Sequence, residues 1–391
     1  MRHIGTVARG IRLPVVMSGD DLKKIVVNSL MEAAASEPDG FKFKDRDIVG
    51  VTESLVARAQ GNYVTTEDIA QDVARLTDEG DAVLLFPILS RNRFLELLKG
   101  IVAGVRGTLH LVLSYPCDEV GNGVMDRQEF YEKAHLLSDS AFDEDEFRRV
   151  FGTWTHPFTG LDYVELYKSV APEKIKVHFA QSPKAALSYA KQVIVASIHD
   201  RNLHRQVLER LGAKVITLDQ ICAAPQEGRG WNDRFGLLGS NYSRAGVVKL
   251  FPRDCEAFVA DLQEELRRQT GRQIDVLVYG DGAFKDPVGG IWELADPVVS
   301  PACTSGLIGM PHEIKFKYVA DNAGDKTPLQ AVTEAIQAKA KTSRSDKTGL
   351  GTTPRRLSDL VGSLCDLVSG SGDKGTPVIY ISGYFDSYIV Q

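Results

Sequence analysis

The chain has 391 residues, of which 43% are hydrophobic, so it can build two or three cores without disulfides or metals to hold them. A formal net charge of -6 argues against a nucleic-acid partner, which would require a basic face. Five scattered cysteines, no signal-peptide core and no run of roughly 18 apolar residues exclude a membrane protein and favour a cytoplasmic location.

The N-terminal half alternates between helix and strand patterns. Thr65 and Asp68 have the spacing of a capping box, and Ser90 is placed to cap a later helix. Strands are predicted at residues 47–52, 55–59, 82–88 and 109–113, and helices at residues 19–35, 65–76 and 90–105.

The same alternation continues to the C-terminus. Strands are predicted at residues 174–180, 193–197, 214–218, 247–254, 273–282 and 378–381, and helices at residues 183–191, 201–211, 257–269 and 357–367. Gly271 is the expected end of the helix over 257–269. The pattern predicts an α/β fold with mixed sheets covered by helices.

Three segments interrupt this alternation. Residues 139–149 are acidic and predict a solvated helix face, whereas residues 223–231 predict an exposed loop. Residues 339–354 are basic and rich in small and hydroxyl side chains, including Lys341, Arg344 and Lys347. That composition is typical of a mobile linker or of a phosphate-binding lid, and both interpretations remain open.

Several catalytic motifs are absent. The chain contains no Walker A lysine motif, no dinucleotide glycine fingerprint, no H-E-x-x-H pair and no G-x-S-x-G elbow. Residues 118–129 resemble a calcium loop, but Val120 occupies a position that needs an oxygen ligand. The absence of these motifs argues against a nicotinamide-dependent enzyme, a zinc protease and a serine hydrolase.

Asp281 is the strongest candidate for a functional residue. It follows the apolar strand pattern of residues 273–280 and stands between two glycines, which would let a ligand approach the backbone. A carboxylate at the carboxyl end of a buried strand can ligate Mg²⁺ or Mn²⁺ beside a nucleotide. The alternative is that Asp281-Gly282 forms only a turn.

A polar loop precedes that strand. Ser240 and Asn241 follow a glycine, and Lys249 and Arg253 lie in the next strand pattern. Such loops can hold phosphates through backbone N–H groups and cations. The alternative is an ordinary hairpin with a satisfied asparagine.

Both ends of the chain resemble the γ-glutamyl ligases that add glutamate to the precursor of the deazaflavin coenzyme F-420. The start Gly19-Asp20-Asp21-Leu22 and the segment over residues 47–61 are similar to the family's G-D-D/N-L and D-I-V-V-V-T-x-K-I-V-S-K-A-E-G motifs. Residues 276–284 resemble the family's V-I-I-x-D-T-F-G-R strand, which places Asp281 at a metal-binding aspartate. The helix over 357–367 and the strand over 375–381 resemble its closing element.

The sequence also departs from the family pattern. Gly282 replaces a threonine, and the aspartate expected after Asn241 is missing, so one metal ligand is unaccounted for. Asp118 and Glu119 are the candidates for the missing oxygens. We expect residues 1–89 and 225–391 to form the ligase-like parts, and residues 90–224 to form an inserted α/β region that reshapes the acceptor pocket.

The resemblance implies a GTP- or ATP-dependent ligase that uses Mg²⁺ or Mn²⁺ to join L-glutamate to a small acceptor carboxylate through an acyl phosphate. Asp281 and Arg58 are the expected catalytic residues, and a homodimer is the expected assembly. Contacts with the nucleotide or acceptor are expected from Thr52, Ser54, Ser240, Asn241, Lys249 and Arg253. Two alternatives remain, namely the same ligation on a folate or other pterin-like acceptor, and a non-catalytic metal- or nucleotide-binding protein.

Overall fold

The structure, a computed structural model, describes residues 4–281, 296–311, 314–341, 355–370 and 374–386. The chain forms two compact units, the first from residues 1–56, 254–282 and 298–391 and the second from residues 57–253 and 283–297. The chain passes from the first unit to the second within the helix α2 (Glu53–Ala59). The domain boundaries expected after residues 89 and 224 both fall inside the second unit.

The first unit contains a five-stranded mixed sheet with the order β1-β14-β2-β12-β13. The central strand β2 runs parallel to its neighbour β12, and every other pair is antiparallel. The register of the parallel pair places Tyr279 beside Thr52, so both strands end at the same edge. The strands are β1 (Val7–Ile11), β2 (Ile48–Thr52), β12 (Asp275–Tyr279), β13 (Ala302–Cys303) and β14 (Val378–Ser382).

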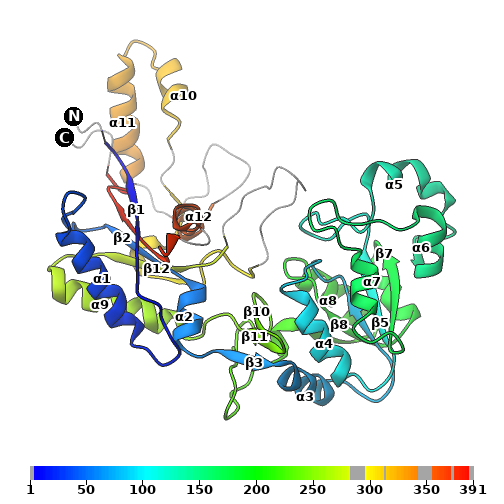
Figure 1. Cartoon of the computed structure of the whole chain (residues 1–391). Helices are drawn as coiled ribbons and strands as arrows, with labels where there is room; N and C mark the ends of the chain where they lie inside the picture. The colour runs from blue at the N-terminus through cyan, green and yellow to red at the C-terminus, as the bar shows by residue number, and fades with distance from the viewer. Residues whose placement is uncertain (1–3, 282–295, 312–313, 342–354, 371–373, 387–391) are drawn as a thin grey trace. The chain divides into compact units, whose positions relative to one another are not determined.

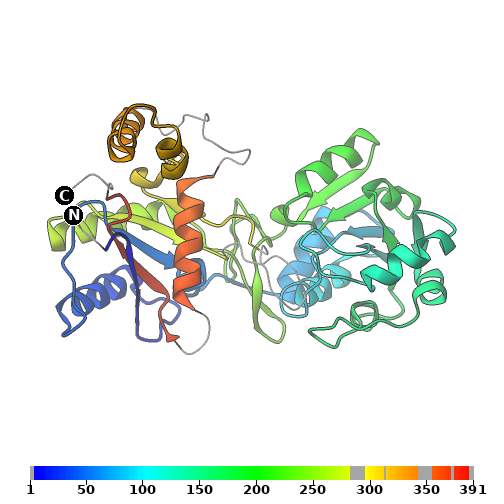
Figure 2. The same ribbon diagram turned by 90° about the horizontal axis from the view of Figure 1, so that it is seen from above.

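Helices cover both faces of this sheet (Figures 1 and 2). The pair α1 and α9 lies on one face and α12 lies on the other. The side chain of Asp21 accepts a hydrogen bond from the backbone N–H of Lys24 at 3.1 Å and caps α1, which lies within the helical stretch predicted at residues 19–35. Gly271, at φ 67°, ends α9. The helices are α1 (Leu22–Ala35), α9 (Cys255–Thr270), η4 (Ser305–Leu307), α10 (Phe316–Asp321), α11 (Pro328–Ala340) and α12 (Leu357–Ser369).

The core under α12 depends on a glycine in the central strand. A Cβ atom at Gly50 would lie 2.5 Å from the Sγ atom of Cys365, on α12. The buried side chains of Leu277, Tyr279 and Val361 surround this contact. Only glycine therefore lets α12 approach β2 so closely.

The second unit contains a small antiparallel sheet and a larger, mostly parallel sheet. The small sheet has the order β10-β11-β3, and the large one has the order β6-β7-β5-β4-β8-β9. All pairs in the large sheet are parallel except β6 with β7. The strands are β3 (Tyr63–Thr65), β4 (Ala82–Leu85), β5 (Leu109–Ser114), β6 (Ala141–Asp143), β7 (Ile175–Ala180), β8 (Gln192–Val195), β9 (Lys214–Thr217), β10 (Asn241–Arg244) and β11 (Val247–Lys249).

The order of the large sheet defines a switch point. Numbered along the chain, its parallel strands read third, second, first, fourth, fifth, which is the order of a doubly wound dinucleotide-binding sheet without its sixth strand. The strand order reverses between β4 and β8, where such folds bind ligands beyond the carboxyl ends of the strands. The helices of this unit are α3 (Thr66–Leu76), α4 (Phe94–Gly104), α5 (Arg127–Lys133), η1 (Ala134–Leu136), α6 (Glu144–Phe151), α7 (Tyr163–Lys168), η2 (Pro183–Ser188), α8 (Arg201–Arg210) and η3 (Leu218–Gln220).

The structure confirms the predicted α/β class and the capping box of Thr65 and Asp68. The prediction of an extended piece at residues 55–59 is wrong, because these residues belong to the helix α2. Leu, Ala and Arg in this segment favour a helix, and burial of Val56 and Ala57 fixes one helical face. No helix in the described parts of the chain combines the length and apolar character that a bilayer crossing needs.

Candidate functional site

Asp281 lies where the sequence places it, at the carboxyl edge of the first unit's sheet. It comes two residues after the end of β12 and is half-buried. Because Thr52 ends the neighbouring parallel strand level with Tyr279, the side chains of Thr52, Glu53 and Ser54 belong to the same edge. The edge thus holds two carboxylates and two hydroxyls. Gly282 lies outside the described residues.

The described residues do not assemble a metal site by themselves. No group of three or more His, Cys, Asp or Glu side chains among them could hold an ion. Mg²⁺ bound to a nucleotide needs only one or two protein carboxylates, because phosphates and water supply the other oxygens. The donors at the Asp281 edge fit that requirement and do not fit an all-protein metal cage.

Asp118 has a different set of partners from the one that the sequence suggested. One oxygen, Oδ1, accepts hydrogen bonds from the backbone N–H groups of Val120, Gly121 and Asn122, at 2.9–3.0 Å. The other, Oδ2, accepts from the backbone of Leu89 at 2.8 Å and from the amide of Asn122 at 2.9 Å. Burial raises the pKa of Asp118 to about 6, against the effect of these donors. Its carboxylate is therefore committed to holding the loop after β4.

Glu119 likewise holds a loop in place, on the opposite side of β4. Its carboxylate accepts hydrogen bonds from the backbone N–H groups of Ile198, His199 and Asp200, at 2.6–3.0 Å. These residues form the loop between β8 and α8. Both oxygens of each carboxylate thus accept hydrogen bonds within the protein. The idea that Asp118 and Glu119 replace a metal ligand stays a prediction.

The polar loop predicted at residues 235–241 leads into a β-hairpin. Asn241 on β10 pairs directly with Lys249 on β11, and the Lys249 side chain is buried. The guanidinium of Arg253 donates a hydrogen bond to the side-chain oxygen of Asn62 at 2.6 Å and lies over the ring of Trp231. Asn241 and Lys249 are therefore brought together, whereas Arg253 has a structural contact of its own.

The remaining predicted cations lie elsewhere. Arg58 is exposed in the last turn of α2. Lys341 directly follows α11, and Arg344 and Lys347 lie outside the described residues. The choice between a linker and a phosphate lid for residues 339–354 thus stays a prediction.

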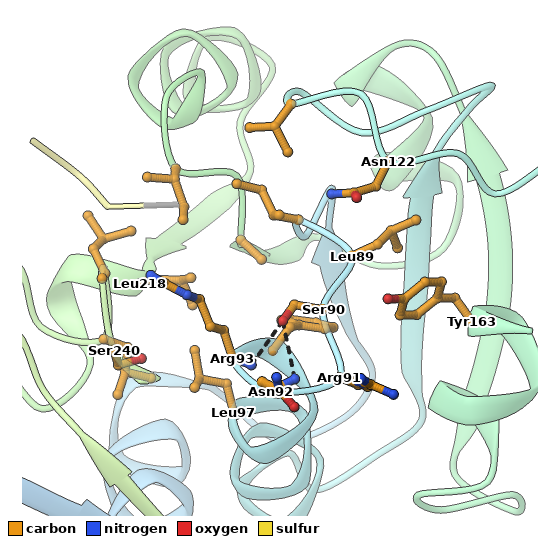
Figure 3. Close-up of a pocket in the computed structure, with 18 of the residues that line it drawn as sticks. Leu89, Ser90, Arg91, Asn92, Arg93, Leu97, Asn122, Tyr163, Leu218 and Ser240 are labelled. Atoms are coloured by element: carbon orange, nitrogen blue, oxygen red, sulfur yellow. Dashed lines mark hydrogen bonds between the residues drawn. The ribbon is translucent and has the colours of Figure 1, made fainter. Parts of the chain in front are cut away.

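The second unit contains a cavity of about 300 Å³ at the switch point of its large sheet (Figure 3). Loops after β4, β5, β8 and β9 form its walls, together with residues 156–163 and the loop that carries Ser240. The lining residues are Ile88, Leu89, Ser90, Arg91, Asn92, Arg93, Phe94, Leu97, Val120, Asn122, His156, Phe158, Thr159, Tyr163, Ala196, Ile198, Leu218, Leu237, Leu238, Gly239 and Ser240. Of the residues proposed from the sequence as binding candidates, Ser240 alone belongs to this set.

Hydrogen bonds fix the wall that follows β4. The backbone N–H of Ser90 donates to the hydroxyl of Tyr167 at 2.8 Å, and the Ser90 Oγ atom accepts from the backbone of Asn92 and Arg93 at 3.2 and 3.0 Å. Ser90 thus closes the turn over residues 91–93 (Figure 3). The helix α4 begins later, at Phe94, with Arg93 as its N-cap and no side-chain cap, so the prediction that Ser90 caps this helix is wrong. Together with the hydrogen bond from Leu89 to Asp118, the contacts of Ser90 hold the wall in place within the protein itself.

Sequence reasoning missed Arg91, Asn122 and Tyr163 as cavity residues. Arg91 lies in the loop after the strand predicted at residues 82–88, and loops at the carboxyl ends of strands bind ligands in doubly wound folds. That signal becomes useful only when the strand order is known, since the order decides which loops meet. Tyr163 comes from α7, far along the chain, and burial raises the pKa of its hydroxyl.

Comparison with known families gives one match. A family model described as F420-0:Gamma-glutamyl ligase matches residues 10–383, which is nearly the whole chain. The match includes the Asp281 edge and also the large parallel sheet of the second unit. A search of curated proteins found no match.

Proposed function

The chain belongs to the F420-0:gamma-glutamyl ligase family, and from that premise we propose that it joins L-glutamate to an acceptor carboxylate in a GTP- or ATP-dependent reaction. The observation that carries this proposal is a family match over both halves of the Asp281 edge, β2 and β12. A deazaflavin precursor is the acceptor that the family name suggests, and a folate-type carboxylate is the alternative.

The proposed chemistry has two steps. An oxygen of the acceptor carboxylate attacks the terminal phosphorus of the nucleotide, the bond from that phosphorus to the bridging oxygen breaks, and an acyl phosphate and a nucleoside diphosphate result. The amine of glutamate then attacks the acyl carbon, loses a proton and expels inorganic phosphate. A bound divalent ion would neutralise phosphate charge during the first step.

The residues of the Asp281 edge have distinct proposed tasks. Asp281, held beyond the end of a buried strand, would orient a metal-bound nucleotide with little motion of its own. Glu53 and the hydroxyls of Thr52 and Ser54 would supply further oxygens or hydrogen bonds from the neighbouring strand end. Arg58, Lys249 and Arg253 are separate candidates for neutralising phosphate charge.

A reconstituted assay tests the proposal. Purified protein is incubated with Mg²⁺ or Mn²⁺, GTP or ATP, labelled glutamate, and either a deazaflavin or a folate acceptor. We expect mass spectrometry to detect an acceptor that has gained glutamate, and we expect Asp281→Ala to abolish that product. Asp261→Ala is the matched control, since Asp261 is an exposed carboxylate on α9 of the same unit.

One outcome would reject the ligase, and another would reject the role of Asp281. Nucleotide binding without any glutamyl product on either acceptor would leave a non-catalytic binding protein. Equal turnover by Asp281→Ala and Asp261→Ala would show that Asp281 is not a catalytic residue.

We also propose that the protein forms a homodimer, which sedimentation analysis of the purified protein tests directly.

A further inference from the structure

The cavity of the second unit has the position of a ligand site. It lies beyond the carboxyl ends of β4, β5, β8 and β9, where the strand order reverses. Its volume of about 300 Å³ is at the lower end of the range for small-molecule pockets. A small ligand would fit, and a dinucleotide would not.

The loop that follows β4 restricts the class of ligand that the cavity can bind. Dinucleotide sites need glycines after the first strand so that a pyrophosphate can reach free N–H groups of the helix. Residues 86–93 contain no glycine, and Ser90 already accepts hydrogen bonds from the N–H groups of Asn92 and Arg93. The cavity is therefore not built for a pyrophosphate.

Ser240 is an unsatisfied polar group on the wall of this cavity. Its side chain is only 3% exposed, and its Oγ atom has no hydrogen-bond partner among the described residues. Figure 3 shows Ser240 on the cavity wall facing the loop that carries Arg93. Leaving a buried hydroxyl unpaired is unfavourable for the free protein. A ligand that pairs with Ser240 would remove this cost.

The backbone at Gly239 holds Ser240 at the cavity. Gly239 has a φ of 68°, and a Cβ atom there would lie 2.7 Å from both the Phe251 ring and Pro297. A glycine is therefore required for the loop to pass between these neighbours. The placement of Ser240 is thus specified by packing.

The charge of the lining favours an anion. Two arginines and no Asp or Glu line the cavity. Arg93 forms an ion pair with the buried Asp296 at 2.9 Å, so its charge is compensated. Arg91 is exposed at the rim, and its guanidinium makes no hydrogen bond or ion pair with any residue that the structure describes. One positive charge is thus available to a ligand.

The rest of the lining is largely apolar. Leu97, Ile198, Leu218 and Leu237 are buried or nearly so and offer no polar side-chain atom. An anion without an apolar body, such as free phosphate or glutamate, would lose water against these four side chains, which offer no hydrogen bonds in return. The ligand therefore needs an apolar body in addition to its charge.

We propose that this cavity binds a small anion, a carboxylate or a phosphate monoester, whose apolar body is about the size of one or two fused rings. Arg91 pairs with the anionic group, Ser240 hydrogen-bonds to a polar atom of the ligand, and the leucine side chains pack on its rings. Nothing in this inference depends on ligase activity.

Binding of three ring-matched probes tests the proposal. The full chain is titrated by calorimetry with naphthoate, naphthyl phosphate and naphthalenemethanol, in the absence of nucleotide and glutamate. We expect one binding site per chain. We also expect at least one of the two anions to bind about tenfold more tightly than the neutral alcohol, because one hydrogen bond to a charged group changes affinity by about that factor. Preference for one of the two anions assigns the ligand to the carboxylate or the phosphate class.

Two variants locate the binding. Arg91→Ala should weaken the anions about tenfold and leave the alcohol unchanged, whereas Arg210→Ala, which removes an exposed arginine of α8, should change neither. Ser240→Ala should weaken the probes and yet raise the urea midpoint of the free protein, because it removes an unpaired buried hydroxyl.

Two kinds of result would contradict anion binding in this cavity. No binding of any probe overturns the proposal. Equal binding of all three probes, or an equal effect of Arg91→Ala and Arg210→Ala, would leave a plain apolar cavity without anion recognition. The ligase assay is scored on product and these titrations on affinity, so either proposal can fail while the other holds.

Discussion

Acidification should destabilise the second unit through a pair of buried histidines. His110 on β5 and His178 on β7 form a hydrogen bond between Nδ1 and Nε2 at 3.0 Å. The ring of Tyr189 stacks on His178 at a centroid distance of 3.9 Å, and His178 is 8% exposed. A hydrogen bond between two imidazole nitrogens needs one donor and one acceptor, so at least the accepting ring is neutral, and burial lowers the pKa of both rings.

The size of the effect follows from the pKa of His178. Burial, and next the proximity of His110, lower that pKa from 6.5 to about 4. The unfolded chain therefore takes up a proton at a pH where the folded chain does not. The contribution of His178 to the free energy of unfolding is present above pH 6.5 and is lost as the pH falls toward 4. From these two values the free energy of unfolding should fall by about 2 kcal/mol between pH 7.5 and pH 5.

Urea unfolding at these two pH values measures the loss. Tryptophan fluorescence reports on this unit, because Trp154 and Trp231 both belong to it. Other groups titrate over the same range, so the quantity to compare is the pH-dependent change in wild type against that in His178→Phe. The phenyl ring keeps the stack on Tyr189 and cannot be protonated. We expect the variant to lose about 2 kcal/mol less than wild type on acidification.

A control separates this mechanism from a general acid effect. His135 is exposed on η1, so His135→Gln should show the same pH-dependent loss as wild type. If His178→Phe also matched wild type in its pH dependence, His178 would not carry the lost stability and the reasoning from its burial would be refuted.

Three further substitutions test the packing around the two candidate sites. Asp118→Asn should lower the free energy of unfolding by about 2 to 4 kcal/mol, since its amide nitrogen would face donors, and chemical denaturation with no added metal measures this. Glu119→Gln should cost less, because an amide oxygen still accepts some of the three backbone N–H groups, and a cost equal to that of Asp118→Asn would contradict the argument. Gly50→Ala should cost about 1 to 3 kcal/mol through its clash with Cys365, and Cys365→Ala in the same chain should recover part of that cost, with fully additive costs as the contrary result.

The sequence predicted best those features that depend on neighbouring residues. The capping box of Thr65 and Asp68 and the Gly271 helix end each rely on contacts within about four residues, and the structure confirms both. The segment at residues 55–59 was predicted wrongly because a short apolar run fits a strand or a helix equally well. Its position between β2 and β3 settles the choice.

The cavity could not be predicted because it depends on strand order. Ser90, Asn122, Ile198 and Ser240 are separated by tens of residues, and they meet only because β5 and β8 pair on either side of β4. No local pattern encodes which strands become neighbours. The sequence could identify the loops that follow strands but not the ones that share a cavity.

Asp118 and Glu119 show that a sequence motif does not reveal the contacts its side chains make in the fold. Two adjacent acids after a strand are a reasonable pattern for metal ligands, and the sequence offers no way to see their partners. In the fold, Asp118 holds the loop after β4 and Glu119 holds the loop after β8. These are the two loops that flank the switch point, and both contribute residues to the cavity wall. The acids therefore act on any ligand through the backbone that they position, and their loss should alter its affinity even though neither carboxylate lines the cavity.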